Sequence, residues 1–294
     1  MVLPFGERVA SAVRATGTCA VVGLDPHLDR LPQTLRSRFQ GKTGRAYLEA
    51  AAQAVVDFNR VVIESVRGLV PAVKPQFAFY EALGAPGWAA LEETCKMASD
   101  AGLITIADAK RGDISSTGAA YARAILDPDG PLGLDAVTLN PWMGLDTLDP
   151  FLGICREHGR GIFVLVRTTN AGSPLLQHHG SPRAAEVVAR ALQVAGEDMV
   201  GPSGMSSIGA VVGASAGEDA GHLRTLMPRA WFLVPGVGAQ GGEAAAAVAG
   251  AREDGLGCLV NSSRGVLYGP DEDADPATAI RKRAQAHASS FRVH

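Results

Sequence analysis

The sequence predicts a single (β/α)8 barrel, and three observations lead to this fold class. Eight short apolar runs, each bounded by turn residues, alternate with segments of helical periodicity along the 294 residues. Short continuous apolar runs are typical of parallel strands that are buried on both faces. Polar residues directly follow most of the runs, as they do at the carboxyl ends of barrel strands. An open, doubly wound sheet is the alternative arrangement of the same alternation.

The elements follow one another along the chain without a linker that would divide it. The predicted strands are 19–23, 70–73, 103–107, 136–139, 161–166, 208–212, 231–234 and 258–260. The predicted helices are 46–66, 88–98, 114–125, 145–158, 181–195, 218–226, 243–253 and 276–288. In the longest of them, apolar residues recur at helical spacing while charged residues occupy the opposite face. We therefore expect one domain over residues 1–294, in which 271–294 form the last loop, the last helix and the C-terminal tail.

Composition argues against several classes of protein. The net charge is −3, and no basic tract suggests binding to nucleic acid or to a membrane surface. No run has the length of a membrane span, and the amino terminus does not resemble a signal peptide. Four cysteines, Cys19, Cys95, Cys155 and Cys258, are widely scattered without a CxxC pair. This pattern is typical of reduced, mostly buried thiols in a cytoplasmic protein and does not favour a zinc site.

The most informative segment is Asp-Ala-Lys-Arg-Gly-Asp at 108–113, directly after an apolar run. Because residues two apart on a strand face the same side, we expect Asp108 and Lys110 to project together from the strand's end. Gly112 permits a tight turn, by which Asp113 could bring a second carboxylate back to the same ammonium. Neighbouring carboxylates keep a lysine protonated, which suits proton transfer. An ordinary surface salt-bridge cluster is the alternative interpretation.

Polar residues that follow other strands are expected at the same rim of the barrel. Asp25 and Lys74 follow neighbouring strands and predict an ion pair, either purely structural or one that also binds hydroxyl groups. The glycine-rich segment 236–242, which contains Gln240, follows the seventh strand, and Arg264 follows the eighth. Backbone N–H groups of such a loop and a guanidinium together predict a phosphate site. Tight turns alone are the alternative explanation for the glycines.

Two further residues allow two interpretations each. Asn140 follows the fourth strand and could bind an amide-like ring edge, because its side chain both donates and accepts hydrogen bonds. It could equally cap the loop before Pro141. Thr117 offers either a ligand-binding hydroxyl or a place in the first turn of a helix.

Several of these segments together carry a resemblance to a known family. In chain order they are Val22-Gly23-Leu24-Asp25, Val73-Lys74-Pro75-Gln76, Asp108-Ala109-Lys110-Arg111-Gly112-Asp113-Ile114, Pro235-Gly236-Val237-Gly238-Ala239-Gln240-Gly241-Gly242 and Ser263-Arg264-Gly265-Val266-Leu267-Tyr268. The chain resembles the orotidine 5′-phosphate decarboxylases, in particular their longer bacterial branch. The Asp-x-Lys-x-x-Asp core is shared with related sugar-phosphate decarboxylases, whereas the full set with Lys74 and Gln240 is more specific.

The resemblance implies that the chain converts orotidine 5′-monophosphate to UMP and CO2, the last step of de novo UMP synthesis. It also implies that no metal and no organic cofactor take part. The family works as a homodimer whose active sites lie at the interface. By that analogy Asp113 and Thr117 would enter the partner's site and complete a charged row with Lys74, Asp108 and Lys110.

The resemblance further assigns contacts to the nucleotide. Asp25 and Lys74 would hold the ribose hydroxyls, and Gln240 and Arg264 would bind the phosphate. The base-contacting residue of other branches has no obvious match, so Asn140 is a candidate on its chemistry alone.

A mechanism follows as a hypothesis. Negative charge develops on C6 of the pyrimidine as CO2 leaves, and Lys110 would stabilise that charge and deliver the proton. Asp108 would lie close to the departing carboxylate and repel it. Two alternatives are a sugar-phosphate decarboxylase that acts on a keto-gulonate phosphate with a divalent cation, and a catalytically silent barrel that only binds a phosphorylated ligand.

Overall fold

A computed structural model of the chain describes residues 2–236, 242–269 and 275–293. Its parallel strands close into a barrel in the order of the sequence, with β8 beside β1. The strands are β1 (Ala20–Leu24), β2 (Ala72–Pro75), β3 (Ile104–Arg111), β4 (Ala136–Leu139), β5 (Gly161–Arg167), β6 (Ile208–Val212), β7 (Phe232–Val234) and β8 (Cys258–Ser262). The predicted barrel is therefore confirmed, and the open sheet is excluded.

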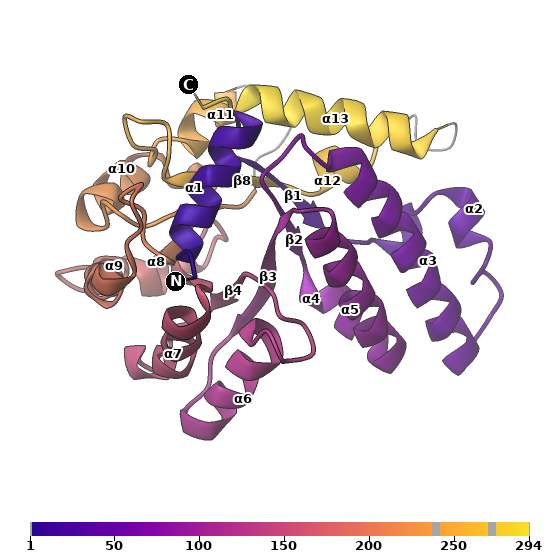
Figure 1. Ribbon diagram of the computed structural model, residues 1–294, viewed down its shortest axis with the longest axis horizontal. Coiled ribbons are helices and arrows are strands. Elements are labelled where there is room, and N and C mark those ends of the chain that lie inside the picture. The colour runs from indigo at the N-terminus through magenta and orange to yellow at the C-terminus, as the bar shows by residue number, and fades with distance from the viewer. Residues whose placement is uncertain (1, 237–241, 270–274, 294) are drawn as a thin grey trace.

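Helices surround the strands (Figure 1), because each crossover between parallel strands returns along the outside of the barrel. They are α1 (Phe5–Thr16), α2 (Gln33–Arg36), α3 (Gly44–Val66), α4 (Phe77–Glu81), α5 (Gly84–Asp100), α6 (Ser115–Leu126), α7 (Asp149–His158), α8 (Ser173–Gln177), α9 (Ala184–Ala195), α10 (Gly217–Leu226), α11 (Gly242–Ala247), α12 (Arg264–Leu267) and α13 (Pro276–Ser290). The 3-10 turns are η1 (Leu28–Arg30), η2 (Leu145–Leu148), η3 (Glu197–Met199) and η4 (Ala214–Ala216). The four cysteines are free and buried, as predicted.

Four of the predicted helices begin or end at least three residues from the observed bounds. Helix α5 begins at Gly84, four residues earlier than predicted, and α9 begins at Ala184, three residues later. The other two differ for local reasons. The helix expected at 145–158 begins as the 3-10 turn η2, and α7 starts only at Asp149. Pro150 explains this start, since proline is accommodated in the first turn of an α-helix. The helix expected at 243–253 ends at Ala247, at the end of α11. A side chain at Gly250 would lie 2.6 Å from the ring of Phe232, so the chain turns there against the barrel.

Helix α1 was not predicted, and it closes the amino-terminal end of the barrel. The ring of Phe5 packs edge-on against Phe163 of β5, with ring centroids 5.8 Å apart. The indole N–H of the fully buried Trp231, which precedes β7, donates to the carbonyl of Gly6 at 3.2 Å. Because α1 covers this end, the opening lies at the carboxyl ends of the strands, where such barrels place their active sites.

Candidate active site

A cavity of about 840 Å³ opens at the carboxyl end of the barrel. This volume lies within the range of ligand sites. The strands that contribute to its lining include β2, β3, β5 and β6. Its charged lining residues are Asp25, Arg30, Lys74, Asp108, Lys110 and Arg264. The structure thus brings five of the residues singled out from the sequence together, and it adds Arg30, which the sequence did not single out.

A buried carboxylate lies between two lysines on one side of this cavity. The Nζ of Lys74 donates to Oδ2 of Asp108 at 2.6 Å, and the Nζ of Lys110 is bonded to Oδ1 of the same carboxylate. Gln76 adds a hydrogen bond from its Nε2 to Oδ2 of Asp108 at 2.9 Å. The side chains of Lys74 and Asp108 are only 3% and 9% exposed, whereas that of Lys110 is 46% exposed. Because two of the three charges are buried, this is not an ordinary surface salt-bridge cluster.

The backbone is irregular where these side chains meet. The register of β3 against β4 shifts in this stretch, and Lys110 has a left-handed backbone conformation with φ of 48°. The Thr138 hydroxyl accepts hydrogen bonds from the N–H groups of Ala109 (3.0 Å) and Lys110 (2.9 Å) and donates to Asp108 (3.2 Å). Asp108 and Lys110 therefore meet through a bulge and not by regular strand alternation. Positive φ at a non-glycine residue costs of order 1–3 kcal/mol and is concentrated at functional sites.

Both buried groups keep their charge. Burial disfavours the ammonium of Lys74, but attraction by Asp108 and Asp25 outweighs burial and raises the pKa of Lys74. Burial likewise disfavours the carboxylate of Asp108, but the ammonium groups of Lys74 and Lys110 hold the pKa of that carboxyl well below its usual range. The row therefore presents a fixed negative charge and two fixed positive charges to whatever the cavity binds.

Asp25 carries a buried acceptor without a partner. Its Oδ1 accepts no hydrogen bond from any residue that the structure describes. The expected ion pair with Lys74 is not formed among these residues, because the Lys74 ammonium pairs with Asp108 and attracts Asp25 only from a longer distance. A side chain at Gly23 would lie 3.0 Å from this oxygen and 2.0 Å from the Ser263 hydroxyl. This oxygen is buried, but Asp25 lines the cavity, so a ligand hydroxyl that enters beside it would meet an unsatisfied acceptor.

Two arginines lie on the side of the cavity formed by β1 and β8. Arg264 begins α12 and makes no ion pair with any residue in the described ranges. The guanidinium of Arg30 lies 4.5 Å from the ring centroid of Tyr268, and it also lines the cavity. The lining includes Gly236, the first glycine of the predicted phosphate loop, while Gln240 lies outside the described residues. Arg30 escaped the sequence analysis because its place depends on Tyr268, far along the chain.

Three other candidates do not line the cavity of a single chain. The Asp113 carboxylate accepts from the N–H of Ile114 at 2.8 Å and forms no ion pair with a described residue. Thr117 is exposed in the first turn of α6, in line with the second interpretation above. The side-chain oxygen of Asn140 accepts from the N–H of Trp142 at 3.0 Å, so it caps the loop after β4.

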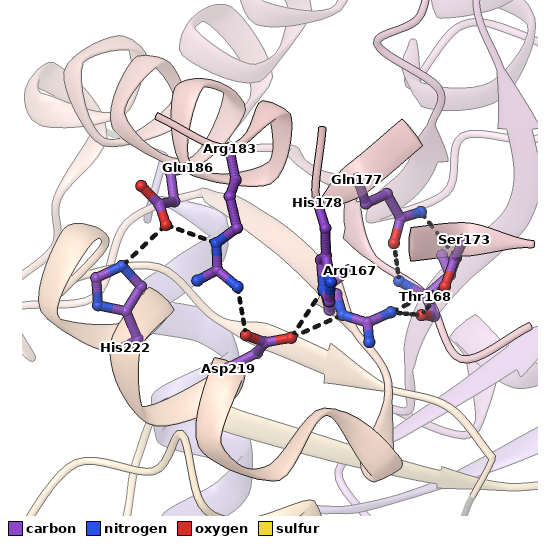
Figure 2. Close-up of polar contacts among 9 residues, drawn as sticks. All are labelled: Arg167, Thr168, Ser173, Gln177, His178, Arg183, Glu186, Asp219 and His222. Atoms are coloured by element: carbon purple, nitrogen blue, oxygen red, sulfur yellow. Dashed lines mark hydrogen bonds and ion pairs between the residues drawn. The ribbon is translucent and has the colours of Figure 1, made fainter. Parts of the chain in front are cut away.

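Residues 168–170, directly after β5, form a wall of the cavity that sequence reasoning missed. The Thr168 hydroxyl donates to the side-chain oxygen of Asn170 at 2.7 Å. Figure 2 shows the polar network behind this wall, which extends to Arg167 and Asp219. Three adjacent small polar residues at the end of a predicted strand were the available signal.

Comparison with known proteins decides the family. A family model described as "Orotidine 5'-phosphate decarboxylase / HUMPS family" matches residues 44–282. The chain belongs to this family. Its curated relatives include an orotidine 5′-phosphate decarboxylase of Rhodopirellula baltica, 41% identical over 272 residues, which are 90% of this chain and 89% of the relative. One from Clostridium perfringens is 36% identical over 98% of both chains.

Solved structures agree with this assignment. The OMP decarboxylase of Leishmania donovani is 32% identical, with a TM-score of 0.73 and 98% of both chains covered. The match to the orotidine 5′-phosphate decarboxylase / HUMPS model begins in α3 and ends in α13, so it includes the buried lysine–carboxylate row. No helix in the described part of the chain is long and apolar enough to cross a membrane.

Proposed function

We propose that this chain converts orotidine 5′-monophosphate to UMP and CO2 in pyrimidine biosynthesis, with Lys110 as the proton donor. The observation that carries the proposal is the buried row of Lys74, Asp108 and Lys110 inside a nucleotide-sized cavity. Membership of the orotidine 5′-phosphate decarboxylase / HUMPS family supports it. Nothing in this row requires a metal ion for its charge balance.

The reaction breaks the bond between C6 and the carboxylate carbon, and the electron pair stays on C6. A proton must then reach C6. Lys110 is the half-exposed member of the row, faces the cavity and is anchored through its own ammonium to Asp108. A fixed ammonium of this kind stabilises the negative charge as it develops, and it transfers its proton without reorganising the site. Solvent then returns a proton to Lys110.

Asp108 contributes through repulsion. In the proposed complex its carboxylate lies near the carboxylate of the substrate. Two like charges ~4 Å apart repel by about 4 kcal/mol at an effective dielectric constant near 20. Because the neighbouring lysines keep Asp108 ionised, it cannot relieve this repulsion by taking up a proton. The repulsion favours departure of CO2 over retention of the carboxylate.

The remaining groups are proposed to orient the nucleotide. The unpartnered oxygen of Asp25 and the ammonium of Lys74 bind the ribose hydroxyls. Arg264, with Gln240 from the loop after β7, binds the phosphate, which lies far from C6. Phosphate binding can therefore supply orientation without taking part in the bond that breaks.

The decisive experiment follows the ultraviolet absorbance of orotidine 5′-monophosphate with the purified protein in excess EDTA. Loss of substrate with an equal amount of UMP is the expected result. Absence of turnover by folded protein, followed by activity on a sugar phosphate after a divalent cation is added, would establish the metal-dependent alternative. Binding of UMP without turnover under both conditions would identify a silent binding barrel.

We also propose that the active form is a homodimer with shared sites. The Asp113 carboxylate lies outside the cavity of its own chain, beside exposed apolar side chains at the same end of the barrel. Ile114, Trp142 and Met143 are 53%, 73% and 51% exposed. Exposed apolar groups of this size are typical of protein interfaces. In the dimer, Asp113 and Thr117 of each chain complete the partner's site.

Mixing two inactive variants tests the shared site. Lys110→Ala and Asp113→Ala should each lack activity, and both should sediment as dimers. After exchange of subunits, a heterodimer contains one site with both substitutions and one intact site, so about a quarter of the wild-type activity should return. If activity does not return although mixed dimers form, Asp113 acts within its own chain or has no catalytic role.

A further inference from the structure

In the cavity wall after β5, the N–H, the carbonyl and the hydroxyl of Thr168 all form hydrogen bonds. Its N–H donates to Oε1 of Gln177 at 2.8 Å, and its hydroxyl accepts from Nε2 of the same amide at 2.8 Å. Its carbonyl accepts from the guanidinium of Arg167 and from the hydroxyl of Ser173, the latter at 2.9 Å. Because the N–H, the carbonyl and the hydroxyl of Thr168 all have partners, the position of this residue is specified.

Arg167 is in turn held by a carboxylate outside the cavity. Oδ2 of Asp219 accepts from Nε of Arg167 at 2.9 Å and lies 3.2 Å from Nε2 of His178. Oδ1 of Asp219 accepts from Arg183 at 2.8 Å. Figure 2 shows Asp219 between these three side chains. The carboxylate on α10 therefore connects the end of β5 with the segment between α8 and α9, which contains His178 and Arg183.

The network is partly shielded from solvent, which strengthens its charged hydrogen bonds. The side chains of Arg167 and Asp219 are 14% and 21% exposed. Burial disfavours the Asp219 carboxylate, but hydrogen bonds from Arg167 and Arg183 lower its pKa, so the group stays ionised.

The other side of the wall is limited by close packing. A side chain at Gly213, just after β6, would lie 2.2 Å from the methyl group of Thr169. The segment is thus held between the Gln177 amide on one side and a glycine without room for a methyl group on the other. It has little freedom to shift unless its anchors change.

We propose that Asp219 is a positioning residue for the nucleotide site, which acts through Arg167 to hold the wall of Thr168, Thr169 and Asn170 against the bound nucleotide. Asp219 does not itself line the cavity. The inference rests on the proposed function, because it takes the occupant of the cavity to be a nucleotide. The competing explanation is a purely structural link between α8, α9 and α10.

The test compares Asp219→Asn with a matched variant at the opposite end of the barrel. Like Asp219, Asp135 is a carboxylate paired with two arginines: Arg8 at 2.6 Å and Arg160 at 3.0 Å. Asp135, however, lies near the amino ends of β3 and β4. Asp135→Asn should lower the melting temperature and leave KM for orotidine 5′-monophosphate unchanged. Asp219→Asn should raise that KM and the Kd for UMP, measured by calorimetry, by up to about tenfold, because only part of the free energy of the lost Asp219–Arg167 hydrogen bond is transmitted to nucleotide binding. Asp219→Glu, which keeps the charge, should restore part of the affinity.

Gln177→Met supplies a second variant, because it removes both hydrogen bonds to Thr168 from a half-buried surface position. It should raise the Kd for UMP in the same direction, and it decides the question if Asp219→Asn does not fold. Wild-type Kd and KM in both variants, with a lower melting temperature alone, would overturn the proposal in favour of a structural link. If wild-type protein binds UMP without turning over the substrate, the proposed reaction fails while the Kd values still test the positioning role. If wild-type protein does neither, both proposals fall.

Discussion

Replacing Asp108 with asparagine should remove the ion pairs that its carboxylate forms with Lys74 and Lys110. The amide matches the carboxylate in size, so the packing around β3 is preserved while the charge is lost. Lys74, 3% exposed, then keeps a buried ammonium whose bonded counter-charge is gone. Removing one partner of a buried ion pair costs about 3–5 kcal/mol of folding free energy. For a chain of this length about 2 °C of melting temperature is lost per kcal/mol, so we expect a decrease of roughly 6–10 °C.

The effect on activity should be larger than the effect on stability. Lys110 loses the anchor of its ammonium, and a misplacement of about 1 Å at a reacting group costs ~100-fold in rate. We therefore expect kcat/KM for orotidine 5′-monophosphate to fall by at least about 100-fold. The assays are the decrease in ultraviolet absorbance for turnover and thermal unfolding followed by circular dichroism.

The pH dependence gives an independent check with a definite sign. The pKa of Asp108 in the folded protein lies below its ordinary value of 3.8, so its ionised form stabilises the fold above that pH. This contribution is lost as the pH falls through the folded pKa. The difference in stability between wild-type protein and Asp108→Asn should be constant near neutral pH and shrink below about pH 4.

An exposed pair provides the control. Asp100 accepts from Lys96 at 2.8 Å on α5, and its side chain is 64% exposed. Asp100→Asn should change stability by less than about 1 kcal/mol and leave turnover unchanged. If Asp108→Asn instead behaves like this control in both assays, the reasoning that the buried carboxylate holds two functional lysines is refuted.

Three further predictions address other parts of the site. Lys110→Ala should abolish turnover while UMP still binds; turnover near the wild-type rate would exclude it as proton donor. Arg264→Ala should weaken UMP binding by about 10–100-fold, as expected for a charged hydrogen bond to phosphate; unchanged affinity would reject the phosphate assignment. Arg30→Ala should weaken UMP binding less, because the Arg30 guanidinium also stacks on an aromatic ring. Calorimetry at two salt concentrations separates the contributions of the two arginines. Gly213→Ala should displace Thr169, since the added methyl group meets it at 2.2 Å, and raise KM for the nucleotide; a wild-type KM would show that the wall can shift without consequence.

The sequence by itself determined the barrel and most of the polar residues that line the cavity at the carboxyl ends of its strands. Strands that are buried on both faces must be continuously apolar, and this leaves a pattern that is readable residue by residue. In a parallel barrel all strands end at the same rim. The polar residues that follow them, such as Asp25, Lys74 and Arg264, could therefore be placed together from their positions in the chain alone.

The tertiary structure decided the features that depend on partners distant in the chain. Lys110 adopts its left-handed conformation beside the Thr138 hydroxyl, 28 residues away. Arg30 lies at the cavity because it stacks on Tyr268. Arg167, whose guanidinium donates to the carbonyl of Thr168, pairs with Asp219, which lies 52 residues after Arg167 in the chain. Local sequence patterns report periodicity and turn chemistry, whereas these contacts arise only when the closed barrel brings distant strand ends within hydrogen-bonding distance.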